Sequence, residues 1–224
     1  MLSLPSVDVF RERVESVPRK DIRMCLMADY IYCGRISEVV AKAYKVDNTV
    51  ARGPTGKDVR LDVYKVGPLK EDAVVFTVRT AKRLGLERKV AVPVVYEPWA
   101  MPLYNYYLQF GSNPVFSFTQ QFVRYWVRKM EVFKGLTYPV ETYPIFKNSI
   151  LVNRVPRHNR NFTLHAIRHL RASELVDFYG FNGPELAIYG GWTFKSIGFP
   201  SATDRYLSLG WQTYFLKLLK RLVV

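Results

Sequence analysis

The chain has 224 residues, of which 49% are hydrophobic and 15% aromatic, enough to bury one sizeable core. Its formal charge of +14 indicates a polyanionic partner, with nucleic acid as the first candidate and an anionic membrane surface as the second. Its longest apolar runs are far shorter than the ~20 residues of a membrane span, and no signal peptide precedes the first charges at Asp8 and Arg11. We therefore expect a soluble intracellular protein.

Cys25 and Cys33 are the only two cysteines. Both fall in or at the end of one predicted helix, roughly 12 Å apart along its axis. A disulfide requires Cα atoms within about 7 Å of each other. Two cysteines without a nearby pair of histidines do not make a zinc site either. We expect two buried, reduced thiols.

The first half of the chain changes from helical to extended patterns. Residues 8–44 follow a helical period with breaks at Pro18 and around Gly34, and a loop with turn signals covers 48–58. Three β-rich runs then predict a small antiparallel sheet, at residues 59–66, 73–80 and 89–96. Pro93 places the third strand at an edge of that sheet.

Helical patterns return in the second half, at residues 99–110, 119–133 (with Thr119 as the N-cap) and 163–179. Residues 134–161, rich in Pro, Asn and Arg, are predicted to be a long loop. Short helices are expected from Pro184 and around Tyr206. The resulting fold class is α+β, mostly α. We divide it into an N-terminal arm (1–19), a main domain (20–210) and a C-terminal amphipathic helix (211–224).

Two basic motifs carry the candidate chemistry. The stretch "CGRISEVVAK" places Arg35 at a helix break and Glu38 one turn later. The stretch "LHAIRHLRASEL" places His165 and Arg168 three positions apart, on one face of a helix. Taken alone, the Arg35–Glu38 motif is better explained as an exposed ion pair on a helix, and a charged helix surface is the other interpretation of the histidine stretch.

These two motifs and two further ones occur along the chain in an order that resembles that of the catalytic domain of the tyrosine recombinase (phage integrase) family. A predicted hairpin carrying Lys82 follows "GRISE", "HAIRH" comes next, "YGGW" ends at Trp192, and "SATDRYLSL" contains Tyr206. The resemblance runs over nearly all of the chain from about residue 20. It implies a recombinase-like fold and a DNA-cleaving and rejoining reaction through a 3′-phosphotyrosine intermediate.

The resemblance also implies roles. Arg35 and Arg168 would hold the anionic non-bridging oxygens of a phosphodiester through paired hydrogen bonds, which a lysine cannot copy. Tyr206 would be the nucleophile, and Lys82 would protonate the leaving 5′-oxygen. His165 would act as a general base or a hydrogen-bond partner at the phosphate.

Three further residues take supporting roles. Trp192 replaces the commoner histidine of its motif, and its indole N–H can donate to the phosphate but cannot titrate. A buried core aromatic is the other interpretation of Trp192. Glu38, and His169 with it, would support the side chains that touch the phosphate. No cluster of Asp and Glu at metal-ligand spacing stands out, so we expect neither metal nor other cofactor.

DNA contacts are predicted at Lys89 in the hairpin and in the stretch "VNRVPRHNRN", which supplies Arg154, Arg157 and Arg160. A solvated basic loop explains those three arginines equally well. The expected partners are double-stranded DNA and further copies of the chain, assembled on DNA as a dimer or tetramer, with no membrane. The expected location is the cytoplasm, associated with the nucleoid, and an origin in a virus or plasmid fits this function.

The tail carries an apolar stripe at helical spacing, made by Trp211, Tyr214, Phe215, Leu218, Leu219 and Leu222. Either it packs on its own domain as a final core helix, or it docks on a neighbouring protomer, as the segment after the nucleophile commonly does in the family. Only 34 residues precede Arg35, too few for the N-terminal DNA-clamping domain of most family members.

Three alternative functions remain. A type IB topoisomerase shares this chemistry but relaxes DNA as a monomer. A non-catalytic relative would keep the basic face and bind DNA without cleaving it. A basic protein bound to ribosomal or other RNA would explain the charge but not the ordered motifs.

Overall fold

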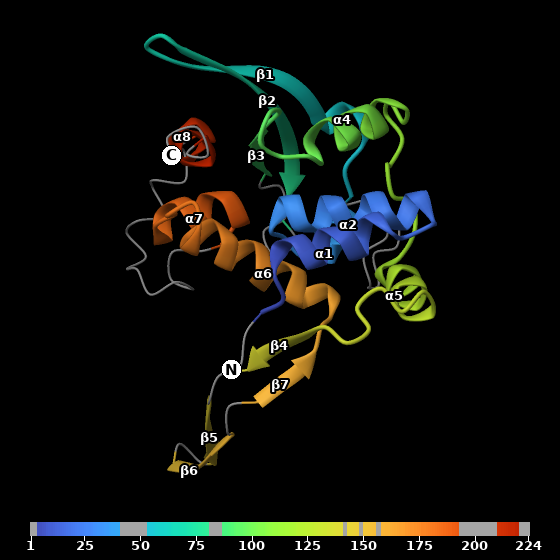
Figure 1. Ribbon diagram of the computed structural model, residues 1–224, viewed down its shortest axis with the longest axis vertical. Coiled ribbons are helices and arrows are strands. Elements are labelled where there is room, and N and C mark those ends of the chain that lie inside the picture. The colour runs from blue at the N-terminus through green and yellow to red at the C-terminus, as the bar shows by residue number, and fades with distance from the viewer. Residues whose placement is uncertain are drawn as a thin grey trace.

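The computed structural model describes residues 4–40, 53–80, 87–140, 143–147, 150–155, 158–192 and 210–219 (Figure 1). Its helices are α1 (Val7–Glu15), α2 (Lys20–Tyr32), α3 (Ile36–Val39), the 3₁₀ helix η1 (Gly56–Asp58), α4 (Ala100–Leu108), α5 (Gln120–Lys129), α6 (Leu164–Asp177), α7 (Gly183–Gly190) and α8 (Gln212–Leu218). Its strands are β1 (Val59–Val66), β2 (Leu69–Arg79), β3 (Glu87–Pro93), β4 (Thr137–Val140), β5 (Tyr143–Lys147), β6 (Ile150–Val155) and β7 (His158–Asn161). The coarse α+β class is confirmed.

Helix α2 forms the centre of the core. Ten of its thirteen residues are buried, as expected for a helix that is apolar on nearly every side. It contacts α1, α4, α5, α6 and strand β3, and Figure 1 shows it crossing the middle of the molecule. It ends at Cys33, whose φ of 48° is left-handed and turns the chain into α3. Cys25 and Cys33 are both buried and free, as predicted.

The boundary predicted at residue 19 does not separate an arm from the core. Phe10 and Val14 of α1 are fully buried, and the Phe10 ring stacks on Tyr30 of α2 at 5.3 Å between centroids. Arg11 adds a bidentate pair with the carboxylate of Glu97, at 2.7 and 3.0 Å. Helix α1 is therefore part of the same hydrophobic core.

The three predicted strands form one antiparallel sheet in the order β1-β2-β3. Strand β1 has the predicted bounds, whereas β2 and β3 begin four and two residues earlier than expected, at Leu69 and Glu87. Pro93 pairs with Ala73 at the end of the edge strand β3, where its missing N–H is tolerated. The helices predicted around Thr119, Thr163 and Pro184 are present as α5, α6 and α7.

The prediction of a loop over residues 134–161 is wrong. Two antiparallel pairs, β4 with β7 and β5 with β6, occupy this segment and extend away from the helices in Figure 1. Pro139 and Pro144 suggested a loop, yet they lie in strands β4 and β5. A strand in a two-stranded pair always has one unpaired edge, so it tolerates proline better than a central strand does.

Helix α8 packs against β3 and α7 of its own chain. Trp211, Tyr214, Phe215, Leu218 and Leu219 of the predicted stripe are buried there, and Leu222 lies outside the described residues. The Tyr214 hydroxyl accepts a hydrogen bond from the Ala91 amide and donates one to the Lys89 carbonyl, both at 3.0 Å. Within this chain, α8 therefore packs on its own domain as a final core helix, which was the first of the two interpretations of the tail.

Replacing Phe215 by Ala should lower the free energy of unfolding by about 3–5 kcal/mol, because it leaves a cavity between α8 and the sheet. Leu216→Ala is the matched control: Leu216 is 50% exposed, so its loss should change the free energy by less than about 0.5 kcal/mol. Urea unfolding of the monomer measures both values. Equal midpoints for the two variants would mean that the stripe serves a contact outside this chain.

Candidate phosphate-binding site

Three segments far apart in sequence meet at one place. Arg35 and Glu38 lie at the start of α3, His165 and Arg168 lie on α6, and Trp192 follows α7. Helix α6 contacts both α2, which leads directly into α3, and α7. The predicted motifs "GRISE", "HAIRH" and "YGGW" are thus brought to one cluster by the packing of α6 between its neighbours.

Arg35 sits at the N-cap of α3, where the helix geometry holds its backbone. Its amide N–H donates to the Glu38 carboxylate at 3.3 Å, which satisfies an amide that the helix leaves without a partner. Its guanidinium is 3.9 Å from the other oxygen of Glu38, and its side chain is 33% exposed. Arg35 can therefore reach a ligand from solvent while its backbone stays anchored.

Arg88, near the start of β3, is buried and connects three elements through hydrogen bonds. It was not singled out from the sequence. Its guanidinium donates to the carboxylate of Glu38 at 3.0 Å and to two backbone carbonyls: Tyr32 at the end of α2, at 2.9 Å, and Tyr189 in α7, at 2.8 Å. Glu38 is thereby fixed between Arg88 and the Arg35 backbone, which agrees with its predicted supporting role. In the sequence, Arg88 is one of two basic residues in "LERKV", and no pattern distinguishes it from Lys89.

The second glycine of "YGGW", Gly191, is required for a steric reason. Gly191 ends α7 with a φ of +65°, and a Cβ at this position would lie 2.6 Å from a guanidinium nitrogen of Arg88. Only glycine combines this left-handed backbone with so close an approach. The absence of a side chain at Gly191 therefore allows the Arg88 guanidinium to pack against the turn that precedes Trp192.

Arg168 is a buried cation with little compensating negative charge around it. It is 5% exposed, lies 4.5 Å from the centre of the Trp192 ring, and donates to the Gly190 carbonyl at 3.4 Å. Among the residues that the structure describes, no carboxylate hydrogen-bonds to it. Burial, together with the charges of Arg35 and Arg88, lowers the pKa of Arg168 to about 10, so the guanidinium is still charged at neutral pH.

Asp29 lies in α2 near this cluster and was also missed. Its side chain is buried, and neither carboxylate oxygen has a hydrogen-bond partner among the described residues. Burial, aided by the charge of Glu38, raises the pKa of Asp29 well above its ordinary value, while Arg168 acts in the opposite direction. Burial therefore favours the neutral form of this carboxyl more than in an exposed aspartate, which leaves less negative charge beside Arg168.

His165 and His169 lie one turn apart on α6. Their rings meet edge to face at 4.9 Å, and His169 stacks on Tyr138 of β4 at 6.3 Å, which holds both rings against the base of the β4–β7 pair. Partial desolvation, then the charges of Arg168 and Arg35, lower the pKa of His165 below its ordinary value. His165 is therefore neutral at pH 7 and can accept a proton or a hydrogen bond.

The low pKa of His165 predicts an acid limb in the pH profile. For the DNA cleavage that the resemblance implies, kcat/KM, which reports the free enzyme, should decline only at a pH below the ordinary range of a histidine pKa, because the ring then becomes protonated. His165→Gln should lower the plateau about 100-fold and remove this limb. A limb that persists unchanged in His165→Gln would assign the titration to another group.

The remaining predicted site residues differ in whether the structure describes them. Lys82, Arg157 and Tyr206 lie outside the described residues, and Arg154 lies in β6. The other two have contacts of their own.

Arg160 is exposed on β7, where its Nε donates to Nε2 of His158 at 3.2 Å. Lys89 lies on β3 and donates to the Thr77 hydroxyl at 2.6 Å. Both remain predicted DNA contacts.

Within the described ranges, no group of three His, Cys, Asp or Glu side chains is placed to hold a metal ion. The same ranges contain no helix with the length and apolar character needed to cross a membrane. Chemically, the cluster offers two guanidinium groups with excess positive charge, a neutral imidazole and an indole ring. Such a set suits an anion with several oxygens.

Comparison of the chain with protein-family models, with curated proteins and with solved structures finds no match.

Proposed function

We propose that this chain is a site-specific DNA recombinase or integrase that cleaves and rejoins double-stranded DNA through a 3′-phosphotyrosine intermediate, with a tyrosine recombinase-like fold. The observation that carries the proposal is the state of Arg168. Its buried charge has no carboxylate partner among the described residues and shares its cluster with Arg35 and His165. A desolvated cation of this kind is stabilised when a phosphodiester occupies the cluster.

The arginines would act on the two non-bridging oxygens. Negative charge gathers on those oxygens in the transition state, and guanidinium groups that are already in place stabilise it without reorganising. Arg168 is held by Trp192 and Gly190, and Arg35 by its backbone bond to Glu38. The neutral His165 would accept a proton or hydrogen bond at the same phosphate.

The strands on either side of residue 82 support the role proposed for Lys82. Lys82 belongs to the connection between Arg79, which ends β2, and Glu87, which begins β3. The next residue, Arg88, is already bonded to Glu38, so this connection starts at the edge of the cluster. Lys82 would protonate the leaving 5′-oxygen, and Tyr206 would attack phosphorus and retain the 3′-phosphate.

The excess of positive charge supports DNA as the substrate. The chain carries 33 Lys and Arg against 19 Asp and Glu, and the partly exposed Arg35 and the exposed Arg160 lie on the segments proposed to face the duplex. Self-association on DNA, as a dimer or tetramer, belongs to the same proposal. A topoisomerase-like enzyme would share the chemistry and differ in acting as a monomer.

A nicked duplex tests the proposal. Cleavage next to a nick releases a short fragment whose 5′-hydroxyl diffuses away, so a covalent protein–DNA adduct accumulates and survives denaturing electrophoresis. We expect this adduct, with excess EDTA present, when the chain is incubated with a pool of such duplexes. DNA that is bound but never attached would leave the non-catalytic DNA-binding alternative.

A further inference from the structure

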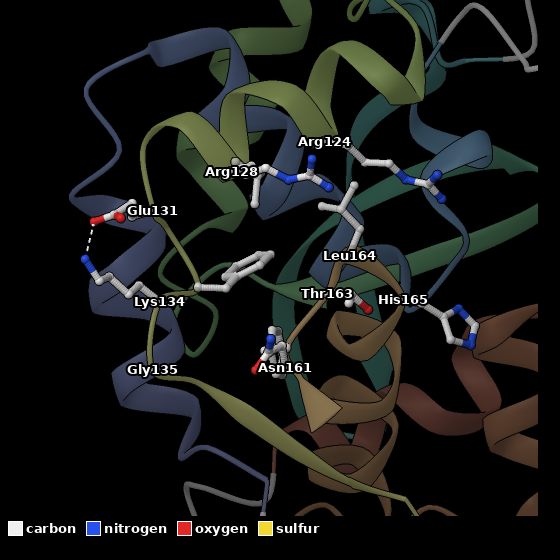
Figure 2. A pocket seen from close by; sticks show the side chains of 12 residues that line it. Arg124, Arg128, Glu131, Lys134, Gly135, Asn161, Thr163, Leu164 and His165 are labelled. Carbon is white, nitrogen blue, oxygen red and sulfur yellow. Dashed lines mark hydrogen bonds and ion pairs between the residues drawn. The ribbon is translucent and has the colours of Figure 1, made fainter. Parts of the chain in front are cut away.

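A hollow of about 720 Å³ opens beside His165, between the end of α5, the turn that follows it, the end of β7 and the start of α6 (Figure 2). His165 borders both this hollow and the phosphate cluster, so the hollow adjoins the place where a strand would bind. The following argument rests on the proposed function in taking that strand to be DNA.

The inner wall of the hollow is apolar. Phe133 and Phe162 meet edge to face at 5.1 Å, and Leu164 projects between the helices in Figure 2. The volume lies within the range of about 300–1,000 Å³ that is typical of small-molecule sites, and far exceeds what one phosphate group fills. A phosphate alone would leave this wall in contact with water.

The mouth of the hollow is cationic. Arg124 and Arg128 lie one turn apart on the same face of α5, and neither guanidinium group makes a hydrogen bond or ion pair with any residue that the structure describes. Lys134, by contrast, is bonded to Glu131 at 2.8 Å, as the dashed line in Figure 2 shows. The hollow therefore presents two uncompensated guanidinium groups above an apolar wall.

We propose that the hollow receives a single unstacked nucleotide of the bound DNA strand, with its base against the apolar wall and a phosphate at Arg124 and Arg128. A nucleotide combines the two properties that the hollow matches, a flat apolar surface and an adjoining anion. Removing a base from the stack costs a few kcal/mol, which contact with aromatic side chains can offset. The side chains of Asn161 and Thr163, which line the same mouth, are available for hydrogen bonds to the base edge.

Two probes of equal charge test the proposal: a short oligothymidylate, and an abasic oligomer with the same number of phosphates. At one salt concentration, the full chain should bind the oligothymidylate about tenfold more tightly. Asn161→Leu, which narrows the mouth with an apolar side chain, should reduce this ratio to near one. Equal affinities for the two probes, or a ratio that survives Asn161→Leu, would overturn the proposal.

Neighbouring cations on α5 supply a matched control. Arg128→Ala should weaken oligothymidylate binding several-fold more than Lys129→Ala, because Lys129 lies over the Trp126 ring, at 4.8 Å, and does not line the hollow. Equal losses of affinity in the two variants would indicate that binding depends only on the net charge of α5, and would contradict the proposal. None of these measurements involves cleavage, so a base-dependent affinity without a covalent adduct would reject the proposed function and keep the hollow. A covalent adduct together with equal affinities for the two probes would reject the nucleotide site and keep the proposed function.

Discussion

Replacing Arg168 by Met should slow DNA cleavage by about 10²–10³-fold, the loss typical of removing one preorganised donor from a transition-state charge. The same substitution should raise the free energy of unfolding by about 1 kcal/mol, because exchanging a poorly compensated buried ion for an apolar side chain of similar volume is often stabilising. The sign follows from the pKa: burial lowers it to about 10, so the folded state disfavours the charge. Single-turnover cleavage and urea unfolding measure the two effects.

Arg168→Lys is the control that keeps the positive charge but removes the planar guanidinium group. It keeps a cation on α6 but cannot donate two parallel hydrogen bonds, so cleavage should remain at least 10-fold slower than in the unaltered chain. A lysine variant with full activity would show that only the charge at this position matters. An Arg168→Met variant that cleaves normally would remove Arg168 from the reaction.

Replacing Arg171 by Met should lower the free energy of unfolding by about 3–5 kcal/mol, the cost of breaking a buried ion pair from one side. Arg171 is buried three positions after Arg168, but its guanidinium is bonded to Glu174 and lies 3.7 Å from Glu97. It also donates to the Tyr189 hydroxyl at 3.2 Å. Although burial opposes the charge, these partners raise the pKa of Arg171 above its ordinary value, so the folded state favours the charge.

The loss should be partly recovered in the double variant Arg171→Met with Glu174→Gln. When Arg171 is replaced, Glu97 keeps its ion pair with Arg11. Among the described side chains, Glu174 then keeps only the hydrogen bond from the neutral Tyr30 hydroxyl. Neutralising Glu174 removes that uncompensated charge. Additive losses in the double variant would show that the two residues do not act as a pair. Urea unfolding of the three variants decides between these results.

The sequence predicted elements whose signals are local. The strand over residues 59–66 and the N-cap at Thr119 depend on residues within a few positions of each other, and both were confirmed, although burial along β1 does not alternate from one residue to the next. The strands over 137–161 were missed because their prolines suggest a loop unless the pairing partner is known. Burial of α1 was missed because Phe10 is buried by aromatic contacts with Tyr30 and residues later in the chain.

The candidate site was predicted where motifs retain a fixed spacing, and missed where only folding brings residues together. His165 and Arg168 share a helix face in the sequence and in the fold. Arg88 and Asp29 have no such pattern, because their roles come from contacts with Tyr189, in a distant helix, and from burial in the core. Charge and spacing therefore predict which groups can bind an anion, whereas packing decides which cations lack a partner.

The most direct measurement is adduct formation on the nicked duplex by the unaltered chain and by Tyr206→Phe, with DNA binding measured in parallel. The substitution removes only the attacking oxygen. We predict a covalent adduct with the unaltered chain, none with Tyr206→Phe, and nearly equal affinities of the two proteins for the duplex. An adduct that forms equally with Tyr206→Phe, or no adduct with either protein despite tight binding, would contradict a phosphotyrosine mechanism through Tyr206.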